Sequence, residues 1–171
     1  MKKSLVLTGM MGVGKSTIGK SLAKKLKLKF VDIDQEIEAK ETFTISDIFK
    51  NKGENYFRKI EQKITLEVLK RKNLVIALGG GAFVNKIIRT KAKNSSVSFW
   101  LDLSTKSILK RLKNIKKRPL LNENNLEETI NTIYTERRKI YNQSDYKIKC
   151  DLLDLNQIVE RIIKLYENSR N

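Results

Sequence analysis

The segment from Gly9 to Ser16, GMMGVGKS, has the spacing of a phosphate-binding loop, G-x-x-x-x-G-K-[ST]. Glycines let such a loop curl around phosphate oxygens with its N–H groups turned inward. Lys15 would supply positive charge for the outer phosphates, and Ser16 a hydroxyl for Mg²⁺. A plain glycine turn capped by Ser16 is the alternative. The loop follows an apolar run and opens a helical pattern, so the motif predicts a nucleotide site.

Two carboxylates follow the next apolar run. Asp32 and Asp34 are two residues apart, so in an extended segment both side chains would point the same way. They could hold hydrated Mg²⁺ and accept a proton from a hydroxyl group. The alternative is that Asp32 ends a strand and Asp34 caps the following helix. Beside a phosphate-binding loop we favour the functional interpretation.

An arginine at an inward helical position predicts an anion site. The apolar stripe over residues 126–141 contains Arg137, whereas Arg138 falls off it. A guanidinium that faces inward needs an anion, and its fork matches a carboxylate or a phosphate. The alternative is a structural arginine paired with a buried acid.

A second arginine lies on the helical pattern over residues 54–71. Glu61 falls within the apolar face of that helix and Arg58 falls at its edge, three residues away, so the two can pair. Either Glu61 orients Arg58 towards a substrate, or the two form a surface ion pair of little consequence. The helical pattern leaves both open.

Three glycines, Gly79, Gly80 and Gly81, follow another apolar run. Backbone without side-chain bulk lets a ligand approach closely, although a tight exit from a strand would explain the triplet equally well. The run ends in Ala77 and Leu78 and offers no acid for a metal, which leaves that task to Asp32.

A polar, basic segment over about 113–125 carries the chain's one proline, Pro119, directly after Arg118. A mobile basic loop over a triphosphate site is typical of a lid that closes on ATP and excludes water. A solvated run of charges is the alternative.

Alternating strands and helices must position these side chains. Apolar runs predict strands over 4–8, 29–32, 74–78, 97–101 and 146–150. Helical patterns lie over about 15–26, 35–40, 45–51, 54–71, 84–93, 104–113, 126–141 and 155–167. This alternation predicts an α/β fold with a parallel sheet covered by helices on both faces. Ligands of such sheets gather at the carboxyl ends of the strands.

Composition limits the class of protein. The 171 residues contain no linker or repeat, so we expect one domain over 1–171. With no histidine, a general base must be a carboxylate or a lysine, and the single cysteine fits a reducing cytoplasm.

We expect neither a membrane span nor a membrane partner. The net charge of +17 is spread along the chain, which favours steering of anionic ligands over nucleic-acid binding.

Taken together, these motifs resemble those of the shikimate kinase family in order and spacing over essentially the whole chain. The matching segments are 9–16, Asp32-x-Asp34, Phe57-Arg58-x-x-Glu61, the glycine triplet, Arg118-Pro119-Leu120, and Arg137 four residues before Tyr141. The resemblance implies a three-layer P-loop kinase fold, with five parallel strands in the order 2-3-1-4-5 and a mobile lid. It also implies that a cytoplasmic monomer uses ATP and Mg²⁺ to convert shikimate to shikimate 3-phosphate, a step towards chorismate and the aromatic amino acids.

The resemblance also assigns roles to residues. It implies catalytic roles for Lys15, Asp34 and Arg118, and metal binding by Ser16 and, through water, Asp32. The ATP-binding residues would be Gly12, Val13, Gly14, Lys15, Ser16, Thr17, Arg111 and Arg118. The shikimate-binding residues would be Asp34, Phe49, Phe57, Arg58, Gly79, Gly80, Gly81 and Arg137, with Glu61 orienting Arg58.

Two rival functions stay open from the sequence. The nearest rival is another small P-loop kinase, for gluconate or a nucleoside monophosphate. A gluconate kinase would also need arginines for a carboxylate, and the glycine triplet favours shikimate over it. A nucleotide-dependent nucleic-acid binder would fit the charge, but it would leave the inward arginines without a purpose.

Overall fold

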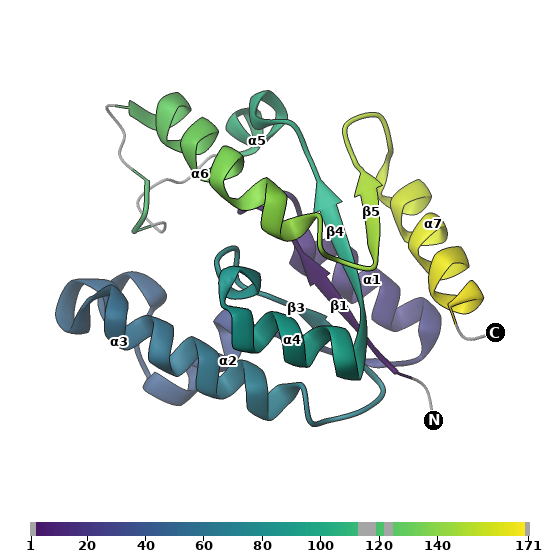
Figure 1. The fold of residues 1–171 in the computed structure, drawn as a ribbon, viewed down its shortest axis with the longest axis horizontal. Helices are drawn as coiled ribbons and strands as arrows, with labels where there is room; N and C mark the ends of the chain where they lie inside the picture. Colours follow the sequence, from purple (N-terminus) through teal and green to yellow (C-terminus); the bar gives the residue numbers. More distant parts are fainter. Residues whose placement is uncertain (1–2, 113–118, 122–124, 170–171) are drawn as a thin grey trace.

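A single parallel sheet organises the chain in the computed structural model, which describes residues 3–112, 119–121 and 125–169 (Figure 1). Its strands are β1 (Ser4–Thr8), β2 (Lys29–Asp32), β3 (Leu74–Ala77), β4 (Ser96–Asp102) and β5 (Tyr146–Lys149). They pair in the order β2-β3-β1-β4-β5, so the order implied by the family resemblance is confirmed.

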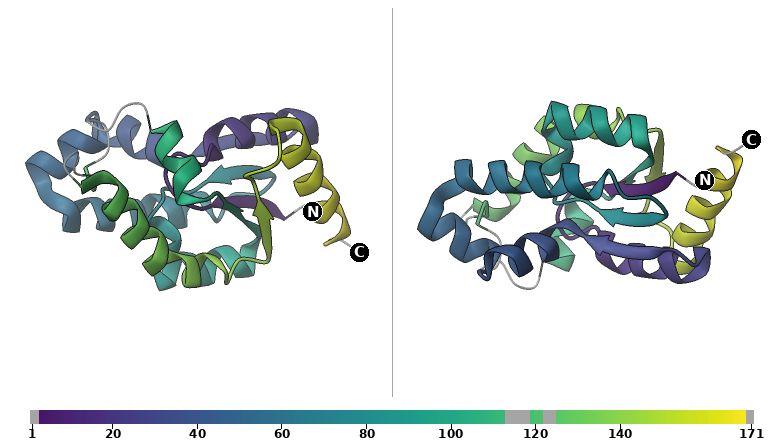
Figure 2. Two further views of the ribbon diagram at one scale, coloured as in Figure 1. Left: turned by 90° about the horizontal axis from the view of Figure 1, so that it is seen from above. Right: turned by 90° about the horizontal axis from the view of Figure 1, so that it is seen from below.

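Helices cover both faces of this sheet. They are α1 (Lys15–Leu26), α2 (Ile33–Glu41), α3 (Ile45–Val68), α4 (Lys86–Ser95), α5 (Thr105–Arg111), α6 (Leu126–Tyr141), α7 (Leu155–Asn168) and the short 3-10 turn η1 (Ala82–Val84). Figure 2 shows α1 and α7 on one face and α4 with α6 on the other. No helix in the described part of the chain has the length and apolar character that crossing a membrane requires.

The central strands form the middle of the core. Every residue of β1 and of β3 is buried, because helices exclude water from both faces of a parallel sheet. This explains why these strands are continuous apolar runs rather than alternating patterns. The edge strand β2 is only partly buried.

Several helix bounds shift by one to three residues from the sequence prediction, and the break expected between residues 51 and 54 is present. The helices expected over 45–51 and 54–71 join in α3 across a kink at Gly53, where φ is 79°. A left-handed φ is accessible to glycine without steric cost, so the chain changes direction there and resumes the helix. The helix expected over 84–93 instead begins at Lys86, because the side chain of Asn85 caps it through the N–H groups of Ile87 and Ile88.

Candidate active site

A cavity of about 590 Å³ lies at the carboxyl ends of β1, β2 and β3. This is the edge of the sheet where the fold class predicts ligands. The expected site residues that line it are Gly12, Gly14, Lys15, Ser16, Thr17, Asp32, Asp34, Phe49, Phe57, Arg58, Glu61, Gly79, Gly80, Gly81, Arg111 and Arg137. The fold therefore brings the phosphate-loop motif and the inward arginines to one cavity.

The phosphate loop has a backbone that only glycine adopts easily. Gly12 and Gly14 have φ values of 78° and 97°. Lys15 begins α1, and its ammonium group donates to the carbonyl oxygens of Gly9 and Met10, both at 2.9 Å. Gly14 occupies the N-cap position and has no side chain to cover the first N–H groups of α1. The free N–H groups at the N-terminal end of α1 can therefore bind an anion directly.

The hydroxyl of Ser16 donates a hydrogen bond to the carboxylate of Asp32. The other oxygen of Asp32 accepts from the N–H of Asp34 at 3.0 Å and so caps α2. The prediction that Asp32 and Asp34 both lie in an extended segment was therefore wrong. Asp34 lies in the first turn of α2, because the cap starts the helix at Ile33, and it is Asp32 rather than Asp34 that caps.

Burial raises the pKa of Asp34 to about 6, and the negative charge of Asp32 adds to the effect while Lys15 opposes it. Asp34 lies against the glycine triplet. A methyl group on Gly79 would be 2.7 Å from an oxygen of Asp34 and 2.8 Å from an oxygen of Glu61. A carboxyl group with this pKa can take up a proton near neutral pH.

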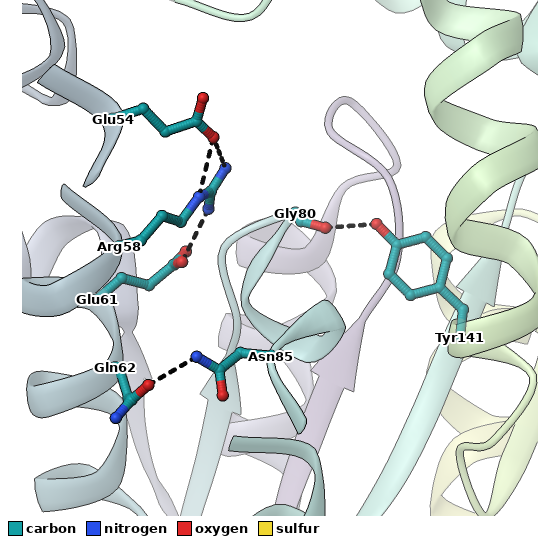
Figure 3. Close-up of polar contacts among 7 residues, drawn as sticks. All are labelled: Glu54, Arg58, Glu61, Gln62, Gly80, Asn85 and Tyr141. Atoms are coloured by element: carbon teal, nitrogen blue, oxygen red, sulfur yellow. Dashed lines mark hydrogen bonds and ion pairs between the residues drawn. The ribbon is translucent and has the colours of Figure 1, made fainter. Parts of the chain in front are cut away.

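Two carboxylates hold the guanidinium of Arg58 (Figure 3). Its Nη1 donates to Glu61 at 2.8 Å, which confirms the expected pairing, and its Nε and Nη2 donate to one oxygen of Glu54 at 3.2 and 3.1 Å. Glu61 is buried, and burial raises its pKa more than the charge of Arg58 lowers it. The sequence analysis missed Glu54, although its spacing of four residues from Arg58 on a helix is a signal for pairing.

Two glycines of the triplet, Gly79 and Gly81, make room for charged groups of the site. A methyl group on Gly81 would lie 2.6 Å from Nη1 of Arg58, too close for a carbon atom. At Gly80 the same group would be 3.4 Å from the nitrogen of Met11 and 3.6 Å from Nη1 of Arg137, which are ordinary contacts. Gly79 and Gly81 therefore allow charged side chains to pack against the main chain, which a tight strand exit alone would not explain.

On α6 the two adjacent arginines have different surroundings. Arg137 is partly buried and lines the cavity. Arg138 is exposed, with its guanidinium carbon 6.0 Å from the centre of the Tyr134 ring. The helix turns Ile130 and Tyr141 into the core, so the apolar stripe predicted from the sequence is present.

The remaining expected residues lie around the phosphate loop and the acceptor side. Arg111 lines the cavity and donates to the main-chain carbonyl of Val13 at 3.3 Å. Val13, which belongs to the phosphate loop, is buried and does not line the cavity. The rings of Phe49 and Phe57 are in tilted contact, with centroids 4.7 Å apart. Arg118 lies outside the described residues.

Several lining residues were not expected from the sequence. They are Met11, Glu38, Ile45, Leu78 and Leu112. Glu38 could have been found, because it follows Asp34 by one helical turn and so shares its face of α2. The apolar ones carry no signal in the sequence beyond their adjacency to predicted site residues.

Comparison with known proteins agrees with this geometry. A family model described as shikimate kinase matches residues 11–167. The shikimate kinase of Sulfurihydrogenibium sp. is 43% identical over 94% of this chain and 96% of its own, and that of Thermodesulfovibrio yellowstonii is 39% identical over 99% and 98%. Among solved structures, shikimate kinase from Acinetobacter baumannii in complex with shikimate has a TM-score of 0.95 and 32% identity, covering 99% of this chain and 95% of that one. A deoxyadenosine kinase from M. mycoides, 20% identical with a TM-score of 0.62, shares the fold alone.

Proposed function

The chain belongs to the shikimate kinase family, and from this premise we propose how its residues divide the work of the family's reaction. In that reaction ATP phosphorylates the 3-hydroxyl of shikimate and gives ADP and shikimate 3-phosphate, on the route to chorismate. One observation supports the division most. A single cavity holds a phosphate loop together with Arg58, Arg137 and a carboxyl group, Asp34, that can accept a proton near neutral pH.

The phosphate loop and the start of α1 bind the nucleotide. The N–H groups of Gly12, Val13, Gly14, Ser16 and Thr17 surround the phosphates, and Lys15 turns from the loop carbonyls to the outer phosphates. Arg111 lies against the adenine, a role supported by its contact with Val13 at the edge of the loop. Arg118, expected to reach the triphosphate, belongs to the part of the chain that the structure does not describe.

The donor set beside Lys15 fits a magnesium ion. The hydroxyl of Ser16 and the carboxylate of Asp32 are hard oxygen ligands in direct contact with each other. Ser16 would hold Mg²⁺ directly, and Asp32 through water. When bound, the ion supplies positive charge that offsets the phosphate charge during transfer.

The acceptor side binds shikimate. Arg58 and Arg137 clamp its carboxylate, with Glu61 orienting Arg58, and Phe49 and Phe57 line the ring. The triplet Gly79-Gly80-Gly81 lets the substrate approach the main chain. Asp34 orients the reacting hydroxyl and takes its proton as the phosphoryl group arrives. Phosphoryl transfer needs this positioning and charge neutralisation more than covalent chemistry.

For the whole chain we propose one domain over residues 1–171, acting as a cytoplasmic monomer. One continuous sheet receives strands from Ser4 to Lys149, which supports the single domain. Sedimentation of the purified protein at two concentrations checks the oligomeric state.

The test of the acceptor is ADP release with shikimate, gluconate, AMP or an oligonucleotide as the only added partner. We expect rapid release with shikimate alone, and a phosphorus NMR signal from a phosphate monoester on the acceptor. Release that is fastest with gluconate or AMP would assign the cavity to another small-molecule kinase. Release that depends on the oligonucleotide would assign it to a nucleic-acid binder.

A further inference from the structure

Glu54 occupies one fork of the guanidinium of Arg58, a residue that lines the cavity. Nε and Nη2 of a guanidinium form one of its two forks, and both donate to the same oxygen of Glu54, at 3.2 and 3.1 Å (Figure 3). Nη1 donates to Glu61 at 2.8 Å. Two carboxylates therefore share one guanidinium in the lining of the cavity.

The two carboxylates differ in how easily they can leave. The side chain of Glu61 is 3% exposed and is packed against Gly79, so it has no path into water without disturbing the buried site. The side chain of Glu54 is 50% exposed and can turn into water. It directly follows Gly53, the kink of α3, where no atom lies within 4 Å of the position that a methyl group would take. Glu54 is therefore the partner that can be exchanged.

The Nε–Nη2 fork of Arg58 needs an acceptor of its own, because Glu61 accepts only from Nη1. The side chain of Arg58 is only 29% exposed, and a partly buried guanidinium without an anion is costly. With Glu54 in contact, the fork stays oriented and partly neutralised before substrate arrives. An incoming carboxylate can take over the same two N–H groups, which match its geometry.

We propose that Glu54 is a placeholder carboxylate, which holds the Nε–Nη2 fork of Arg58 in the free enzyme and is exchanged for the carboxylate of shikimate on binding. The inference rests on the proposed role of Arg58 in the acceptor site. It makes Glu54 a residue that determines specificity. A ligand with a carboxylate replaces the interaction that it breaks, whereas a neutral ligand leaves Glu54 in place and gains nothing from Arg58.

Calorimetric titration of E54Q with shikimate tests the proposal. Glutamine keeps the size of the side chain and removes the competing charge, so we expect the Kd for shikimate to fall by about two- to fivefold, the value of one partly exposed ion pair. The Kd for ATP should not change. The Kd for methyl shikimate, which lacks the carboxylate charge, should also stay the same.

E67Q is the matched control. Glu67 lies on the same helix, is 45% exposed, and forms an ion pair with Lys40 at 3.5 Å rather than with Arg58. It should bind shikimate as the wild type does. If E54Q binds shikimate more weakly, Glu54 supports Arg58 instead of competing for it, and the proposal is overturned. Unchanged binding by E54Q, or equal tightening by E67Q, overturns it too.

Failure of the proposed function gives a different result. In that case the wild type itself would neither bind shikimate nor release ADP with it. Failure of the placeholder role leaves wild-type binding and turnover intact and removes or reverses only the difference between E54Q and the wild type.

Discussion

The hydroxyl of Tyr141 donates a hydrogen bond to the main-chain carbonyl of Gly80, which lies 61 positions earlier in the sequence (Figure 3). Tyr141 is completely buried, with its ring against that of Trp100 at a centroid distance of 5.9 Å. Burial raises the pKa of the Tyr141 hydroxyl, which keeps it protonated as a donor. The bond thus joins α6, the helix that carries Arg137, to the glycine triplet that lines the same cavity.

Replacing Tyr141 by phenylalanine should therefore disturb shikimate binding more than ATP binding. Y141F leaves a buried carbonyl without its donor, at a cost of about 1–3 kcal/mol. We expect KM for shikimate to rise about tenfold, the equivalent of about 1.4 kcal/mol, while KM for ATP stays nearly constant. Y134F is the control, because the hydroxyl of Tyr134 on the same helix donates to Asp102 at 2.8 Å and not to the glycine triplet. Equal effects of the two variants on KM for shikimate would refute the positioning role of Tyr141.

Alanine substitutions in the glycine triplet test whether the triplet makes room for Arg58, with G80A as the control for G81A. A methyl group at Gly81 would meet Arg58 at 2.6 Å, whereas one at Gly80 makes only contacts of 3.4 Å or longer. G81A should displace Arg58 and raise KM for shikimate by at least about tenfold, an effect of about 1.4 kcal/mol. G80A should be mild, and both variants should keep the wild-type KM for ATP. The account fails here if G80A is the more harmful of the two.

Asp34 should lower the stability of the fold at neutral pH. Its pKa is raised from 3.8 to about 6 in the folded state, so folding favours the protonated form. The stability that protonation contributes is complete below pH 4 and is lost as pH rises through about 6. A shift of about 2 units corresponds to about 3 kcal/mol. The unfolding free energy of D34N minus that of the wild type should therefore grow by up to that amount between pH 4 and 7.

Denaturant unfolding of both proteins across this pH range measures the difference. D34N should also lose phosphoryl transfer to shikimate, because an amide cannot take the proton of the hydroxyl. A stability difference that does not vary with pH would mean that the carboxyl group of Asp34 titrates normally, and a D34N enzyme with wild-type kcat would remove its role as proton acceptor.

The parts of the fold that follow local patterns could be predicted from the sequence. The strand Ser4–Thr8 and the helix Lys15–Leu26 have the bounds that the apolar run and the helical periodicity indicate. The choice of Arg137 over Arg138 as the inward arginine also holds, because helical periodicity alone decides which of two neighbours faces the core.

Features set by one capping bond or one distant contact could not be predicted in this way. Asp34 lies in a helix because a single side chain, Asp32, caps that helix two residues earlier than the pattern suggests. A break between residues 51 and 54 was expected, but the positive φ of Gly53 at that break is not given by the helical pattern. The bond from Tyr141 to Gly80 joins elements whose proximity only the folded sheet determines.

The central claim is that the cavity binds the carboxylate of shikimate through Arg137 on one side and Arg58 on the other. Calorimetric titration of R137A and R138A, each with shikimate and with ATP, tests it most directly, since the two residues are adjacent on α6 and differ in exposure to the cavity. R137A should lose at least about tenfold in affinity for shikimate, as expected for a charge-assisted pair worth about 1.5–3 kcal/mol, and should bind ATP almost as the wild type does. R138A should bind both ligands normally. Equal losses in the two variants, or a larger loss of shikimate affinity in R138A, would contradict the account.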